Sequence, residues 1–199
     1  MSSVCLFVNI QQSAVKLYSH SVMRQFEWLL KFLLGMIRFL LIINNHGKAR
    51  LTKFYSFYSE EQQQKLVREC YALVTRRGEE MCNFLEASFP FLENDLRIIY
   101  RHYATLYFVC GVDAVESELG ILDLIQVFVE TLDRCFENVC ELDIIFHPDK
   151  VHYVLDEIIV GGLVMETNVT EIYNAVQLAN NQEARLLHGN KALNRVFRQ

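Results

Sequence analysis

The chain has 199 residues, of which 52% are hydrophobic and 22% are charged, and it contains only two prolines. This composition is typical of one compact domain with a substantial core. The formal net charge of −5 argues against non-specific binding to nucleic acid, which needs a basic surface. Six scattered cysteines form no CxxC pair and no zinc-finger spacing. They favour reduced thiols in a cytosolic protein, without metal or cofactor.

The amino-terminal part contains a strongly apolar run over residues 26–43. A membrane-spanning helix needs roughly 20 mostly apolar residues, and this run is interrupted by Glu27, Lys31 and Arg38. A signal peptide would carry its positive charge before the apolar run and small residues after it, and this chain does neither. We therefore expect a buried strand from residue 36 onward, preceded by an extension over 1–35 with a helix over 22–34.

A β-hairpin is predicted at the start of the main domain. The nearly continuous apolar run from Met36 to Asn44 indicates a central strand that is covered on both faces. Residues 45–48, with the sequence NHGK, are typical of a turn because Asn and Gly tolerate positive φ angles. The residues from Arg50 to Phe57 then predict the returning strand.

A well-capped helix follows the hairpin. Ser59 and Gln62 fit a capping box, and Gly78 is a typical residue at the end of a helix. A short strand is expected from Cys82 to Ser88. The apolar run from Leu96 to Val112 is too long for one ordinary strand, so we expect two strands or one sharply bent strand.

The carboxyl-terminal half is predicted to be helical. Ala114 to Phe136 has an unusually wide apolar arc, which suggests contacts beyond its own sheet. Pro148 is placed to begin the next helix, whose apolar repeat runs to Ile159 before Gly161-Gly162 stops it. A shorter helix is expected from Val169 to Leu178, then a polar tail over 181–199. Runs of adjacent strands followed by helices predict an α+β fold with an antiparallel sheet.

No constellation of catalytic residues is recognisable. His147 and His152 are five residues apart, a spacing that does not place them on one helix face, so surface residues are a better interpretation than metal ligands. The acidic residues over 113–118 precede a helix, whose dipole explains them without catalysis. The sequence has no nucleophile elbow, phosphate loop, GxGxxG or HExxH motif. We expect no enzyme activity.

Several segments between residues 36 and 180 carry a family resemblance: MIRFLLIINNHGKARLTKFY, CNFLE, IIYRHYATLYFV, FVETLD, FENVCELDIIF, and KVHYVLDEIIVGG followed by ET. They resemble the small (sigma) chains of the clathrin-type adaptor complexes. IYRHYATLYFV and SELGILDLIQVFVETLD look closest to the sigma branch of the third adaptor complex. Met36 aligns with the family's usual first residue, so residues 1–35 depart from the pattern, as an upstream start or a gene-model extension would explain.

The resemblance implies a longin-like fold, with a five-stranded antiparallel sheet flanked by helices. It also implies a small subunit of a heterotetrameric vesicle-coat adaptor, serving traffic from endosomes or the trans-Golgi toward lysosomes and related organelles. Its obligate partner would be a large adaptor chain, which joins it to the remaining subunits. The complex would associate peripherally, from the cytoplasm, with Golgi and endosomal membranes.

The resemblance further implies a pocket for acidic dileucine signals, of the form [DE]xxxL[LI], in cargo tails. Its expected lining lies on the sheet edge, on the long helix and after that helix: Ala104, Leu106, Val129, Asn138, Val139, Leu142 and Ile144. Arg50 would face the acidic residue of the signal, together with a basic residue of the large chain. Thr105 differs from the glycine of some relatives. Periodicity alone would favour core positions for the apolar residues and a solvated strand residue for Arg50.

Two alternatives remain open at this point. The chain could complete a complex without binding cargo, in which case signal binding would be absent although assembly is intact. It could also be a longin-domain subunit of another coat or tethering complex, although the segment FENVCELDIIF is adaptor-like and argues against this.

We expect the chain to be poorly soluble without a large adaptor chain, because the wide apolar arc of the helix over 114–136 would leave an exposed patch. Expression alone and in combination, followed by size-exclusion chromatography, measures this. A monodisperse, stable monomer at high concentration would count against obligate assembly.

Overall fold

The computed structural model describes residues 36–78, 82–87, 89 and 96–181. The extension over 1–35 with its expected helix, and residues 182–199 of the expected tail, lie outside these residues. None of the helices described is both long enough and apolar enough to cross a membrane.

A five-stranded antiparallel sheet forms the centre of the molecule, in the order β2-β1-β5-β4-β3. The expected hairpin is present, and the long apolar run divides into two strands at a two-residue turn, Ala104-Thr105. The strands are β1 (Ile37–Asn44), β2 (Ala49–Phe54), β3 (Phe84–Ala87), β4 (Leu96–Tyr103) and β5 (Leu106–Val112).

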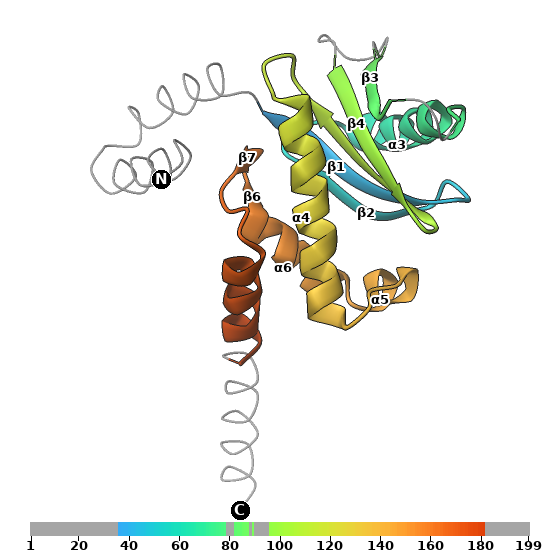
Figure 1. Cartoon of the computed structure of the whole chain (residues 1–199). Helices are drawn as coiled ribbons and strands as arrows, with labels where there is room; N and C mark the ends of the chain where they lie inside the picture. The colour runs from blue at the N-terminus through green and yellow to red at the C-terminus, as the bar shows by residue number, and fades with distance from the viewer. Residues whose placement is uncertain (1–35, 79–81, 88, 90–95, 182–199) are drawn as a thin grey trace, which may run out of the picture.

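Helices cover both faces of this sheet, which confirms the expected α+β class. Figure 1 shows α3 behind the sheet and α4 lying across its front, with α6 beside α4. The helices are α3 (Glu60–Thr75), α4 (Glu118–Phe136), α5 (Glu141–Phe146) and α6 (Pro148–Ile158). A small hairpin of β6 (Ile159–Val160) and β7 (Leu163–Val164) follows, and residues 169–181 are helical.

The structure corrects two sequence predictions and adds one helix that the sequence did not predict. Helix α4 begins at Glu118 instead of Ala114, because the Ser117 hydroxyl accepts a hydrogen bond from the Gly120 N–H and so caps the helix. Ile159 belongs to a strand and not to the preceding helix, since the two glycines that follow form a tight turn between β6 and β7. The added helix is α5, whose six residues are too few to show a helical period in the sequence.

The apolar strands explain the three-layer arrangement. In β1, Phe39, Leu41 and Ile43 point toward α3, whereas Leu40 and Ile42 point toward α4 and α6. These side chains are at most 1% exposed. Successive residues of a strand face opposite sides of the sheet, so a continuous apolar run must be covered on both sides.

Strand β5 contains a glycine that makes room for a neighbouring ring. Gly111 pairs with Phe39 of β1, and an added Cβ would lie 2.3 Å from the Phe39 ring. Since real Cβ atoms do not approach other atoms so closely, only glycine fits beside this buried phenylalanine.

A carboxylate fastens α5 to the edge of the sheet. The Glu141 carboxylate accepts hydrogen bonds from Asn44 Nδ2 (3.0 Å), Arg50 Nε (2.8 Å) and Thr105 Oγ1 (3.2 Å). The Asn44 Oδ1 atom meanwhile accepts from two N–H groups of the β1–β2 turn. Partial burial would raise the pKa of Glu141, but these hydrogen bonds and the Arg50 charge outweigh it and lower that pKa.

We expect Gly111→Ala to lower the free energy of unfolding by about 1 to 3 kcal/mol, as overpacked cores do. Thermal unfolding of the full-length chain measures the change. Gly78→Ala is the matched control, because no atom lies within 4 Å of an added Cβ there, and we expect a change within about 0.5 kcal/mol. Equal stability of the two variants would contradict the account of Gly111.

We expect Glu141→Gln to lower the free energy of unfolding by about 1 kcal/mol at pH 7, since it weakens charge-assisted hydrogen bonds. A lowered pKa in the folded state gives stability that is present above the unfolded value of about 4.3 and is lost as the pH falls through the folded value. The wild type and the variant should therefore converge in acid. Unfolding curves at several pH values would refute this if the difference stayed constant.

Candidate functional site

A cavity of about 300 Å³ lies where the β4–β5 turn meets α4 and α5. Its walls come from the strand ends, the last turns of α4 and the start of α5. The lining residues are Tyr103, Ala104, Thr105, Leu106, Phe108, Val129, Leu132, Asp133, Val139, Cys140, Glu141 and Ile144. Most of these side chains are apolar, so the cavity is suited to an apolar ligand group.

Left-handed backbone conformations shape two walls of this cavity. Ala104 has φ 51° in the β4–β5 turn, and Glu137 and Asn138 have φ 54° and 82° after α4. Such angles are uncommon for residues other than glycine. The Asp133 carboxylate accepts a hydrogen bond from the Val139 N–H (3.1 Å) and so fixes the reversal after α4. This reversal directs the chain back along α4 and places Val139 in the cavity wall.

The structure brings together five of the seven residues that the resemblance assigned to a pocket. Ala104, Leu106, Val129, Val139 and Ile144 line the cavity. The other two lie outside its lining: Asn138 is exposed on the reversal, and Leu142 is 58% exposed on α5.

Arg50 lies at the rim and is already paired. Its Nε and Nη2 atoms each lie 2.8 Å from one oxygen of Glu141, which itself lines the cavity. The side chains are 22% and 24% exposed. Sequence reasoning missed Glu141, because nothing local relates it to an arginine 91 residues away.

Two thiols in the described part of the chain are deeply buried in the core. Burial raises the pKa of both Cys70 and Cys110 to about 12, so these thiols stay protonated at neutral pH. Cys82 and Cys140 are exposed, and none of the five described cysteines forms a disulfide. Among the residues that the structure describes, no group of three or more His, Cys, Asp or Glu side chains could hold a metal ion.

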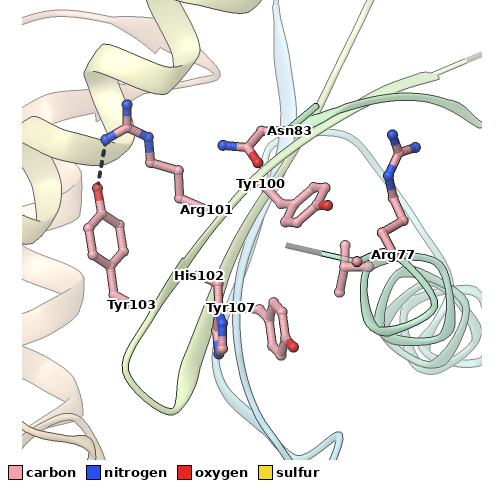
Figure 2. Close-up of a pocket in the computed structure, with 9 residues that line it drawn as sticks. Arg77, Asn83, Tyr100, Arg101, His102, Tyr103 and Tyr107 are labelled. Atoms are coloured by element: carbon pink, nitrogen blue, oxygen red, sulfur yellow. Dashed lines mark hydrogen bonds between the residues drawn. The ribbon is translucent and has the colours of Figure 1, made fainter. Parts of the chain in front are cut away.

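A second cavity, of about 600 Å³, lies near the end of α3 (Figure 2). Figure 2 shows Tyr100 and Tyr107 toward Arg77, which follows the end of α3. Arg101 lies on the α4 side and is hydrogen-bonded to Tyr103. No carboxylate occurs among the described lining residues. The His102 ring in this lining is stacked on the Tyr107 ring, with 4.1 Å between the ring centroids.

Comparisons with known proteins point to one family. The model of the clathrin adaptor complex small chain family matches residues 36–183. The AP-3 complex subunit sigma of Dictyostelium discoideum is 60% identical over 150 residues, which cover 74% of this chain and 88% of that protein. The human AP-3 complex subunit sigma-2 is 60% identical over 148 residues, covering 74% and 77% of the two chains. The Arabidopsis thaliana AP-3 complex subunit sigma is 50% identical over 149 residues, covering 75% and 89%.

A structural comparison agrees with these relatives. A chain of a homology model of the full-length AP-3 complex, in a stretched open conformation, superposes with a TM-score of 0.60 at 40% identity. The match covers 77% of this chain and 99% of that one. The longin-like sheet and these relatives agree, and the chain belongs to the clathrin adaptor complex small chain family.

Proposed function

We propose that the chain is the small subunit of an AP-3-type adaptor complex and that its apolar cavity binds acidic dileucine signals. As in the relatives that it resembles, it would assemble with other adaptor subunits. The complex would act in vesicle transport from endosomes or the trans-Golgi toward lysosome-related organelles, on the cytoplasmic side of the membrane. In this role the chain binds and positions other proteins and performs no catalysis.

One observation supports cargo binding most directly. Five residues line one cavity although they come from the β4–β5 turn, the start of β5, α4, the segment after α4, and α5. They lie as far apart in sequence as Ala104 and Ile144. Leu106 and Ile144 are 7% and 1% exposed, whereas Val129 and Val139 are partly buried at the cavity wall. An apolar wall that is only partly covered by its own chain favours an apolar ligand group.

The expected affinity follows from the size of the ligand group. Burying two leucine side chains contributes roughly 3 to 6 kcal/mol before costs. Ordering a flexible cargo tail offsets a large part of this, so we expect dissociation constants on the order of tens to hundreds of micromolar. Weak sites suit a coat, in which many adaptors and cargo tails act together on one membrane.

A structural role without cargo binding is the second candidate, and one contact favours it. Arg50, the expected partner of the acidic signal residue, is already bonded to Glu141. The rim therefore presents a neutral pair, and cargo recognition would need either the apolar wall alone or a cation from another subunit.

We expect Val129→Asp to weaken binding of a labelled ExxxLL peptide at least tenfold, because it places a charge in the apolar wall. The measurement is a fluorescence titration of the full-length chain co-purified with the AP-3 large chain. Val115→Asp is the matched control, since Val115 is 62% exposed before α4 and outside the cavity lining.

The assembled complex must elute as one species in each case. If the wild type assembles with the large chain but binds no peptide, cargo binding is refuted and the structural role is supported. Failure to assemble with the large chain would refute the adaptor function itself.

A further inference from the structure

Glu141 and Arg50 form a direct ion pair at the rim of the cavity. Both guanidinium contacts of 2.8 Å go to the same carboxylate oxygen, Oε1. An arginine has five N–H donors, so two are engaged by this carboxylate. In the described part of the chain, Glu141 is the one acidic residue in a salt bridge with Arg50.

The Glu141 carboxylate is held in place from more than one side. Asn44 donates to Oε1 at 3.0 Å, and Thr105 donates to Oε2 at 3.2 Å. Asn44 is only 3% exposed, and its own oxygen is engaged by the N–H groups of His46 and Lys48. Glu141 is therefore a fixed, ionised group whose position does not depend on Arg50 alone.

This fixed charge has a consequence for an acidic ligand. A ligand carboxylate that approaches Arg50 also approaches the Glu141 carboxylate, which repels it. Because the charges of Arg50 and Glu141 lie close together, their fields largely cancel at distances longer than their separation. The apolar wall is unaffected. The Arg50–Glu141 pair therefore weakens recognition of the acidic residue of the signal without affecting recognition of its two leucines.

We propose that Glu141 is a specificity-determining residue that competes with the acidic residue of the signal for Arg50. Because of this competition, the chain by itself distinguishes acidic from neutral dileucine peptides only weakly, and a strong preference requires cations outside this chain. The proposal rests on the function proposed above for the cavity.

The test compares two peptides, ExxxLL and its neutral counterpart QxxxLL, on the full-length chain co-purified with the AP-3 large chain. The quantity is the acid preference, defined as Kd for QxxxLL divided by Kd for ExxxLL. We expect Glu141→Gln to raise this preference about three- to tenfold. Glu141→Asp should stay near the wild type, because it keeps the charge. Glu130→Gln, an exposed glutamate on α4, removes the same charge away from Arg50 and should leave the preference unchanged.

A second comparison tests the Glu141 charge in the absence of Arg50. Arg50→Gln leaves the Glu141 charge uncompensated, so its acid preference should be lower than that of the double variant Arg50→Gln/Glu141→Gln, in which any cations of the large chain act in the same way. Equal preferences in these two variants would mean that Glu141 does not act on the peptide, and would overturn the proposal. If Glu141→Gln weakened the binding of both peptides by the same factor, the proposal would also be overturned, because that result indicates that Glu141 is a purely structural residue.

These outcomes separate the two proposals. Suppose that Val129→Asp abolishes peptide binding and that Glu141→Gln has the same acid preference as the wild type. This result would overturn the role of Glu141 and leave the proposed function intact. Absence of binding to the wild type and to Glu141→Gln would overturn both. Binding of ExxxLL that appears only in Glu141→Gln would support the competition strongly.

Discussion

The central strands β1 and β5 carry large apolar side chains on both faces, so neither face of the sheet can remain in water. Helix α3 covers one face, and α4 with α6 covers the other. Phe39 occupies space that Gly111 leaves open on the neighbouring strand, which allows the two middle strands to pack closely. Because the helices cover the two faces of the sheet, the candidate site forms at the ends of the strands.

The site lies at the strand ends where two turns and one helix start meet. The β1–β2 turn contributes Asn44, the β4–β5 turn contributes Ala104 and Thr105, and α5 contributes Glu141. A backbone hydrogen bond from the Asn45 N–H to the Thr105 carbonyl joins the two turns. Polar contacts thus fix the rim, while the apolar wall behind it comes from side chains that also belong to the core.

This division has a functional meaning for an adaptor subunit. In the proposed function, the apolar cavity would give modest affinity for a leucine pair, and charge recognition would be shared with a neighbouring subunit. The Arg50–Glu141 pair would make such sharing necessary, because its charges cancel within the chain. Assembly and cargo selection would then be linked, since only the assembled complex would hold all the charges that read the signal.

Local patterns in the sequence determined most of the fold. The capping box at Ser59, the proline that begins α6, and the run of β1 that is apolar on both faces each act within a few residues. Their consequences are therefore predictable. The apolar side of α4 was also predictable from its period: Ile121, Ile125, Phe128, Leu132 and Cys135 are all buried. For the pocket, periodicity alone favoured the core, and only the family resemblance selected its residues.

Tertiary structure decided what depends on residues far apart in the chain. The partner of Arg50 is 91 residues away, and that of Asn44 is 97 residues away. Whether these side chains meet depends on the length of α4 and on the left-handed reversal at Glu137 and Asn138. The sequence by itself determined the elements and their buried faces, because hydrophobic periodicity is a local property. Only the folded chain could place Glu141 against Arg50, because the distance between two side chains is set by the packing of every element between them.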